Sequence, residues 1–334
     1  MAMPLNKLIL PLLRCPRSGL ALEPAPGSPA ELVDGELISR DGQHRYPVRQ
    51  GVPILLGDVT DAERFTARSF GEQWRLFHET GGLGKGFEED LTATFFDPVP
   101  MAELRDKVIL EAGCGQGRNL IQVAKAGARL VIGMDVSEAA FLAKEKGADV
   151  VIGDILQPPF APELFDVVFT FGVMQHVSDP DAGFRTLGRL VRPGGRVCHS
   201  VYSLENNRLL ARHFSPLRER YFRHWPIGVK MGVSWLVAVP SYLFFLLCYW
   251  PLSLSRTGDG WGQRHLFYYP FAMLFVRRLG FRAWLAQVYD HFNAPLIQYF
   301  ARERLERWCR EAGLVETYFI HRNRTAWNFG GRTP

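Results

Sequence analysis

The sequence predicts a doubly wound α/β fold, in which helices cover both faces of a mostly parallel sheet. The first observation is a glycine turn: residues 108–120 begin as a β-prone apolar run, continue through glycines at 113, 115 and 117, and end in a helix-compatible segment. The second is that further short apolar segments follow it, at 130–135, 150–154, 165–171 and 190–200, with helical stretches between them. Strands that alternate with helices are typical of a parallel sheet.

The glycine turn and the two acids that follow it in the sequence predict a nucleotide-binding site. A Cβ in the turn would keep the backbone from closing on a ligand, and the following helix start offers free N–H groups. Asp135 ends the second strand about 20 residues further on, where an acid accepts hydrogen bonds from two ribose hydroxyls. Asp154 ends the third strand. Because ligands in such sheets lie at the carboxyl ends of the strands, both acids are expected at the site.

Together these motifs resemble class I S-adenosylmethionine-dependent methyltransferases over roughly residues 105 to 202. In chain order the motifs are Glu111-x-Gly113-x-Gly115-x-Gly117, Asp135, Gly153-Asp154, the Phe165-Asp-x-Val strand and Arg192-Pro-Gly-Gly, the last taken as a turn before a strand. A nicotinamide dehydrogenase is expected to show Gly-x-Gly-x-x-Gly, whereas Arg118 stands where that last glycine would be. The resemblance implies a seven-stranded Rossmann-like methyltransferase sheet with S-adenosylmethionine as cofactor.

The resemblance also implies roles for single residues. The glycines would approach the methionine part of the cofactor, Asp135 its ribose, and Asp154 with Ile155 its adenine, while residues 171–176 would line the floor beneath the sulfonium. The implied cofactor-binding residues are Glu111, Gly113, Gly115, Gly117, Asp135, Val136, Asp154, Ile155, Phe171, Gly172, Phe70 and Trp74. Two alternatives stay open at this point: Glu111 as a cap or salt-bridge residue, and Asp154 as a turn residue.

Residues 1–58 form a pattern of short strands between Gly and Pro, and resemble the zinc-ribbon-like module of the tRNA-methyltransferase activator family. In members that bind zinc the first knuckle is Cys-Pro-x-Cys, but here Ser18 follows Cys15 at the second cysteine position. Tetrahedral zinc needs four ligands, which Cys15 and His44 cannot supply. We therefore predict a degenerate module without metal, held by apolar packing.

Residues 59–104 are expected to form a helical linker and lid. The helix at 65–77 resembles a Phe-Gly-x-x-Trp helix that precedes the sheet in related fused methyltransferases and closes over the cofactor, which places Phe70, Gln73 and Trp74 at the ligand. Packing of this aromatic face on the core is the alternative. The glycine-rich stretch 81–86 lacks Walker spacing and is interpreted as a flexible lid or linker.

Composition narrows the class of protein. The 334 residues are 47% hydrophobic and 22% charged, which are values of a globular chain. The five cysteines are scattered without metal-ligand spacing, and a net charge of +5 is too small to predict a nucleic-acid partner. The first residues lack the features of a signal peptide, so a cytoplasmic location is expected.

Residues 205–285 are predicted to be a basic and apolar helical insert. From 231 to 255 there is no charged residue, a length that could cross a membrane. A single crossing is excluded because the closing strands, expected between 315 and 329, must return to the same sheet. Pro240 and Pro251 therefore predict a broken or re-entrant hairpin, partnered by residues 266–276.

A basic cluster precedes the apolar stretch and favours contact with an anionic surface. Its members are Arg208, Arg212, Arg218, Arg220, Arg223 and Lys230, against the single acid Glu219. We interpret residues 208–276 as a peripheral contact with the inner face of the membrane. A buried cap over the substrate pocket and an interface with a partner protein are the alternatives.

Residues 286–334 are expected to supply a helix and the closing strands of the core, and resemble the tail of fused methyltransferases from Tyr289 to Leu314. His176, at the end of the fourth strand, is the first candidate for the base that takes a proton from the acceptor, and His291 is the second. A pocket-shaping role for His176 and a turn-capping role for Asp290 stay open.

The function that this pattern favours is methylation of an apolar or amphipathic small molecule, such as a lipid, quinone, polyketide or other natural product, with oxygen as the first choice of acceptor atom. A methyltransferase acting on RNA or a translation factor is the alternative, although the fourth strand does not end in an Asn-Pro-Pro-Tyr-type motif. A binding or scaffold protein that retains the cofactor fold without catalysis is the third hypothesis.

Overall fold

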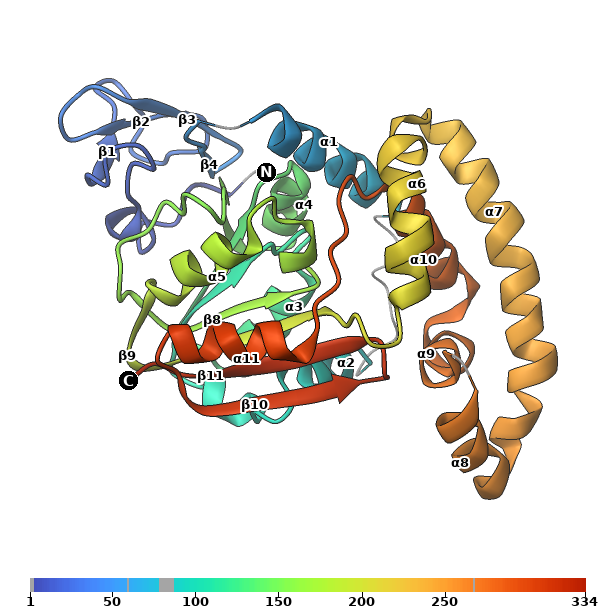
Figure 1. Ribbon diagram of the computed structural model, residues 1–334. Coiled ribbons are helices and arrows are strands. Elements are labelled where there is room, and N and C mark those ends of the chain that lie inside the picture. The colour runs from blue at the N-terminus through green and yellow to red at the C-terminus, as the bar shows by residue number, and fades with distance from the viewer. Residues whose placement is uncertain (1–2, 59, 78–86, 267) are drawn as a thin grey trace.

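The structure, a computed structural model, describes residues 3–58, 60–77, 87–266 and 268–334. Within these residues one sheet of eleven strands runs through the molecule, and a helical insert stands at one side of it (Figure 1). The strand order is β1-β2-β3-β4-β7-β6-β5-β8-β9-β11-β10. The glycine-rich stretch 81–86 lies outside the described residues, so the prediction of a lid there is not addressed.

The predicted methyltransferase sheet forms the larger part of this sheet and confirms the expected fold. Its strands are β5 (Val108–Ala112), β6 (Leu130–Asp135), β7 (Asp149–Gly153), β8 (Phe165–Phe171), β9 (Val191–Tyr202), β10 (Val315–Arg322) and β11 (Ala326–Arg332). The first five are parallel, and β11 is antiparallel to both β9 and β10. The sequence places Arg192-Pro-Gly-Gly before the fifth strand, but β9 already begins at Val191 and takes in these residues where its pairing with β8 shifts register.

Both faces of the sheet are covered, as expected for parallel strands that are apolar throughout. Ile109 and Leu110 are neighbours on β5 that point to opposite faces, and both are fully buried. The flanking helices are α2 (Phe87–Phe96), α3 (Arg118–Lys125), α4 (Ala139–Glu145), α5 (Pro180–Gly188) and α11 (Arg302–Glu311), with short turns η3 (Met101–Leu104) and η4 (Met174–His176). In α11 the predicted face of Leu305 and Trp308 is buried against the sheet.

The front module is a small antiparallel sheet, as its spacing of Gly and Pro predicts. It comprises η1 (Leu10–Leu12), β1 (Leu22–Pro24), β2 (Gly35–Ser39), β3 (Arg45–Arg49) and β4 (Val52–Leu55). Its last strand pairs in parallel with β7, through Ile54 and Ile152, so the module extends the core sheet. The sheet is therefore wider than the seven strands that the resemblance implies. The division into units at 58, 104, 204 and 285 stays a prediction.

Helix α1 (Asp61–Leu76) leads from the front module towards the insert. It begins with a capping box: the Thr60 hydroxyl accepts from the Glu63 N–H, and the Glu63 carboxylate accepts from the Thr60 N–H at 2.7 Å. This pair satisfies two backbone donors that a helix start otherwise leaves open. The helix that the sequence predicts from Phe65 onward is present and starts four residues earlier.

The insert is helical, but the chain does not break at Pro240, one of the two prolines from which the hairpin was predicted. Its elements are η5 (Leu210–Phe214), α6 (Ser215–Arg220), η6 (Phe222–His224), α7 (Ile227–Phe244), η7 (Phe245–Tyr249), η8 (Pro251–Leu254), α8 (Arg256–His265), α9 (Tyr269–Leu274), η9 (Phe275–Leu279) and α10 (Gly280–Asn293). Pro240 lies inside α7, in one helical run from 227 to 254. A proline deprives the carbonyl four residues earlier of its donor, and Leu236 is on the exposed side, where water can replace that donor.

The chain reverses only after residue 254 and returns as α10, which packs along α7 (Figure 1). The second apolar stretch does partner the first, because Tyr269, Ala272 and Met273 form one buried cluster with Phe245 and Tyr249. Two members of the predicted basic cluster are buried, Arg218 to 1% exposure and Lys230 to 4%. These two cations therefore do not belong to the surface, in contrast to the sequence interpretation.

Candidate active site

The glycine turn between β5 and α3 is a close-fitting piece of backbone. Gly113, Gly115 and Gly117 have φ of +83°, +51° and +78°, a left-handed conformation that other residues rarely adopt. A Cβ on Gly113 would lie 2.4 Å from Cγ2 of Val173, and one on Gly115 would lie 3.0 Å from Cε2 of Trp74. Glycine is thus required here by conformation and by space, and Trp74 of α1 lies directly against the turn.

Asp135, at the carboxyl end of β6, is fixed beside this turn. One carboxylate oxygen accepts from the Gly115 N–H at 2.8 Å. The other accepts from the N–H and hydroxyl of Ser137, at 2.8 and 2.6 Å. Burial raises the pKa of Asp135, while these bonds favour its charged form. A carboxylate has about four acceptor positions, so one remains for a ligand hydroxyl. Val136 follows it and is half-buried.

Asp154 and Ile155 follow β7 and differ in environment. Asp154 accepts from the Leu156 N–H at 2.9 Å through one oxygen, so it makes the turn bond that the sequence left open. Burial raises the pKa of Asp154. Ile155 is 7% exposed and belongs to the main apolar core, where it lies close to Gly183.

Glu111 lies at the base of the glycine turn as a buried carboxyl group. One oxygen accepts from the side-chain amide of Asn119 at 3.1 Å. The other, Oε2, has no hydrogen-bond partner among the described residues, although it is fully buried. Burial raises the pKa of Glu111 to about 8, so the group is mostly protonated at neutral pH. A buried polar atom without a partner at this position suits a ligand that brings one.

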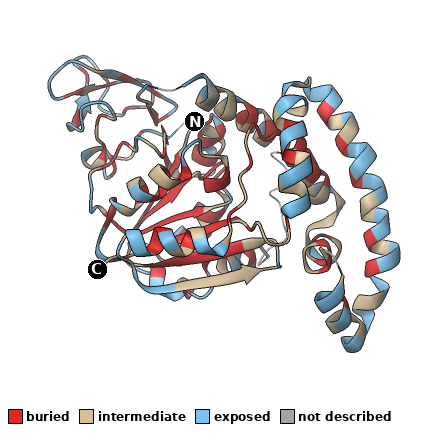
Figure 2. Ribbon diagram, viewed as in Figure 1, coloured by how far each residue is buried: buried red, intermediate tan, exposed pale blue. Residues whose placement is uncertain are grey.

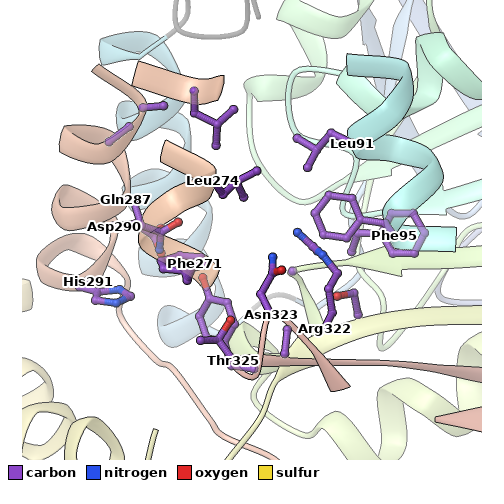
Figure 3. Close-up of a pocket in the computed structure, with 18 of the residues that line it drawn as sticks. Leu91, Phe95, Phe271, Leu274, Gln287, Asp290, His291, Arg322, Asn323 and Thr325 are labelled. Carbon is purple, nitrogen blue, oxygen red and sulfur yellow. The ribbon is translucent and has the colours of Figure 1, made fainter. Parts of the chain in front are cut away.

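A cavity of about 350 Å³ opens beside the turn (Figure 3). Of the residues that the sequence assigns to the site, seven line it: Phe70, Gln73, Trp74, Phe171, Gly172, His176 and His291. The turn itself reaches the cavity through Gln116 and Arg118. The residues assigned to the site that do not line this cavity are Glu111, Gly113, Gly115, Gly117, Asp135, Val136, Asp154 and Ile155. They lie along the adjoining carboxyl ends of β5, β6 and β7.

His176 is held in a defined tautomer. Its Nδ1 lies 2.7 Å from the carbonyl oxygen of Leu296, and since a carbonyl only accepts, Nδ1 is the protonated nitrogen. Nε2 then carries the lone pair. Burial lowers the pKa of His176, opposed in part by the charge of Asp290, so the ring is neutral at pH 7. The edge of Phe70 packs on it with ring centroids 4.8 Å apart.

Asp290 and His291 face the same cavity from α10 (Figure 3). Asp290 lies within the last turn of this helix, so it does not have the turn-capping role that the sequence left open. Its carboxylate accepts from the side-chain amide of Gln73 on α1 at 2.8 Å. The Nδ1 atom of His291 is buried without a hydrogen-bond partner among the described residues, and burial lowers the pKa of His291.

The sequence did not single out several residues that line the cavity. They are Leu91, Phe95, Tyr202, Tyr268, Phe271, Leu274, Tyr299, Arg322 and Asn323, among others. Of these, only Tyr202 and Arg322 could have been predicted from the sequence. Each lies at the carboxyl end of a β-strand that runs in the same direction as β5. The insert residues gather here only through tertiary packing, which no local pattern records.

Residues 110–199 match the family model described as a methyltransferase domain. This segment spans the glycine turn and the acids of the site. These residues form an S-adenosylmethionine-dependent methyltransferase domain. S-adenosylmethionine is the cofactor of this domain, and the chain fits it with a glycine cradle, an acid that keeps an acceptor position, and the unpartnered oxygen of Glu111.

Curated relatives of the methyltransferase domain differ in substrate. A tRNA (carboxymethyluridine(34)-5-O)-methyltransferase of Arabidopsis thaliana is 29% identical over 138 residues, 40% of this chain and 32% of its own length. A ubiquinone biosynthesis O-methyltransferase of Pseudomonas entomophila is 37% identical over 106 residues, 29% of this chain and 45% of its own. The chain thus spans less than half the length of these two relatives.

Among solved structures, phosphoethanolamine N-methyltransferase 2 of Haemonchus contortus in complex with S-adenosyl-L-methionine is 14% identical, with a TM-score of 0.46. The match covers 87% of this chain and 62% of the other. The insert at 205–285 lies outside the residues that the family model matches.

Proposed function

We propose that this chain transfers the methyl group of S-adenosylmethionine to an oxygen of an apolar or amphipathic small molecule. The observation that supports this most is the lining of the cavity. At one side it meets the flanks of the glycine turn, and elsewhere aliphatic and aromatic side chains make up much of its walls beside a few polar groups: Leu91, Phe271, Leu274, Phe275 and Leu279. An apolar wall with a few polar groups is typical of small-molecule sites.

The cofactor supplies an activated methyl group together with its own leaving group. The chain must then orient the acceptor and take its proton. In our proposal Nε2 of His176 accepts that proton, because it carries the lone pair and its ring lines the cavity. Asp290 raises the affinity of this ring for a proton through its charge. His291 is the second candidate for the same role.

We also propose that α7 and the segments that continue it rest on a lipid surface. Within the described residues, one helical run, Ile227–Leu254, is long and apolar enough to cross a membrane, and only 11% of its most apolar window is buried. Much of its outer side is exposed (Figure 2). Leu236, Leu247 and Leu254 are 75%, 74% and 72% exposed.

The exposed apolar side of α7 fits a helix that lies on a lipid surface better than a helix that crosses a membrane. The chain returns through α10 to β10 and β11, which pair within the same sheet, so α7 lies on one side of any membrane. The exposed cations Arg208, Arg212 and Arg220 precede it and suit anionic headgroups, each worth about 1 kcal/mol. The location we propose is therefore cytoplasmic and peripheral on the inner face of a membrane.

The front module is proposed to be a zinc-ribbon-like unit that has lost its metal. The thiol of Cys15 lies 3.1 Å from the Tyr46 hydroxyl and accepts from the Ser18 N–H at 3.4 Å, so neighbours of its own module surround it. In the part of the chain that the structure describes, no three His, Cys, Asp or Glu side chains are grouped to hold an ion. Stoichiometric zinc in purified protein would overturn this proposal.

One observation favours RNA as an alternative acceptor: the Arabidopsis relative is a tRNA methyltransferase. A scaffold protein without catalysis is the alternative from another class. The three hypotheses separate in one experiment. The protein is incubated with methyl-labelled S-adenosylmethionine and with a total lipid extract or total RNA of the source cells. Label in the organic phase, lost in His176→Ala, supports the proposal, whereas label in RNA alone, or in neither, contradicts it.

A further inference from the structure

Arg322 lines the cavity wall and has no counter-ion among the residues that the structure describes. It ends β10, and its guanidinium carbon lies 4.0 Å from the centre of the Phe95 ring. Its Nε atom is fully buried and has no hydrogen-bond partner among the described residues. Nor does any acid of the described ranges form an ion pair with it, whereas Arg196 and Arg304, which are also largely covered, pair with Glu103 and Asp181.

Arg322 is largely covered and lies near a second cation, Arg118. Burial, and next the like charge of Arg118, lower the pKa of Arg322 to about 10, so it still carries its charge at neutral pH. Arg118 lines the same cavity, and both face it from the carboxyl side of the sheet. The acid of the cavity, Asp290, lies on the opposite wall and is bonded to Gln73 (Figure 3).

We infer that Arg322 binds an anionic group of the acceptor, a carboxylate or a phosphate, while the apolar body of the acceptor fills the rest of the cavity. This inference rests on the proposed function, because it takes the cavity as the acceptor site. A guanidinium presents a planar fork that matches either anion, and the Phe95 ring holds one face of it. The free edge of the Arg322 guanidinium points into the space between α2 and the wall formed by α9 and α10 (Figure 3).

The cofactor also carries a carboxylate, which Arg322 could bind instead. The order of the strands favours binding of the acceptor by Arg322. The glycine turn follows β5, whereas Arg322 ends β10, four places along the order β5-β8-β9-β11-β10. At about 4.8 Å per strand the backbones of the two strand ends are roughly 19 Å apart across the sheet, although the long Arg322 side chain spans part of this distance. Two stacked rings also stand between: Phe95, under the guanidinium, packs on Phe171 with centroids 5.0 Å apart. Arg322 thus lies on the acceptor side of Phe171.

Calorimetric titration tests the inference without any turnover. Decanoate, decyl phosphate and the neutral decan-1-ol are each titrated into full-length protein saturated with S-adenosylhomocysteine. We expect the two anions to bind more tightly than the alcohol. Arg322→Met, which keeps the packing on Phe95, should weaken both anions by about 10- to 100-fold and leave the alcohol unchanged. Arg310→Gln is the control, an exposed arginine on α11 that does not line the cavity, and should change nothing.

Equal affinity for anions and alcohol in the unmodified protein would overturn the inference. So would a loss of S-adenosylhomocysteine affinity in Arg322→Met, because that would assign the guanidinium to the carboxylate of the cofactor. Should Arg322→Met fail to fold, Arg322→Lys keeps the charge without the fork, and the anions should weaken by about tenfold or less. Anion binding by a protein that transfers no methyl group to the lipid extract would refute the proposed function; Arg322 would then remain an anion site, but not for a methyl acceptor.

Discussion

The side-chain amide of Gln73 donates a hydrogen bond of 2.8 Å to the carboxylate of Asp290, across 217 residues of sequence. The oxygen of the same amide accepts from Asn293, which in turn accepts from the buried ammonium of Lys230. A buried polar chain therefore joins α7 and α10 of the insert to α1, the helix that lies against the glycine turn. This chain couples the apolar insert to the wall of the cofactor site.

Breaking this chain should loosen the insert. Gln73→Leu removes the side-chain donor to Asp290 and one of the two acceptors of the Asn293 amide, which should cost about 1–3 kcal/mol in the free energy of unfolding. Arg68→Gln, on the exposed side of the same helix, should cost less than about 0.5 kcal/mol. Chemical denaturation of both variants measures the difference. A Gln73→Leu protein as stable as Arg68→Gln would show that the chain of bonds contributes nothing net.

His176 should govern the rate of methyl transfer and its pH dependence. Removing a positioned base typically costs about 10²–10⁴-fold, so His176→Gln should lose that much in kcat while its affinity for S-adenosylhomocysteine is unchanged. Because burial lowers the pKa of His176, the rate should be flat near neutral pH and fall only below the ordinary value of 6.5. His291→Gln is the comparison. If His176→Gln lost less kcat than His291→Gln, His291 and not His176 would be the base.

His199 should make the fold sensitive to acid. Its ring is buried, its Nδ1 lies 2.8 Å from the Thr170 hydroxyl, and burial lowers its pKa to about 3. The unfolded chain takes up a proton near pH 6.5 and the folded chain does not, so stability is lost as the pH falls from 6.5 towards 3. Between pH 7 and pH 5 this should cost about 2 kcal/mol. Denaturation curves of His199→Gln should lack this loss, whereas the exposed control His213→Gln should retain it.

The outer face of α7 should carry the contact with lipid. Replacing Leu236, Leu247 and Leu254 together by serine removes about 1 kcal/mol of apolar burial each, so binding to anionic vesicles should fall by about 100-fold. Leu8→Ser is the control, because this leucine is 69% exposed on the front module. Vesicle flotation measures both. Unchanged flotation of the triple variant would mean that α7 does not meet the membrane.

The core sheet was predictable because its signals are local. The glycines at 113, 115 and 117, the acid Asp135 and the alternation of strands with helices each follow from neighbouring residues, and the structure has the expected parallel strands around them. The parallel pairing of β4 with β7 was not predictable, because it depends on two backbones that meet across about a hundred residues.

The insert, in contrast, was predicted poorly because local patterns do not decide its structure. Pro240 was expected to break the helix on local grounds, but an exposed proline position costs the helix only a bond that water can replace. Arg218 and Lys230 were taken for surface cations because both lie in a basic run, yet the fold buries them. Arg322 was within a predicted strand, but its place beside Phe95 depends on how α2 crosses the sheet.

Binding of the cofactor to the glycine turn is the claim on which the rest of the account depends. The most direct test is calorimetric titration of S-adenosylhomocysteine into the purified protein and into Asp135→Ala, with NAD titrated in parallel. We predict micromolar binding to the unmodified protein, its loss in Asp135→Ala, and none with NAD. A folded protein that binds NAD instead, or that binds S-adenosylhomocysteine equally well without Asp135, would contradict the account.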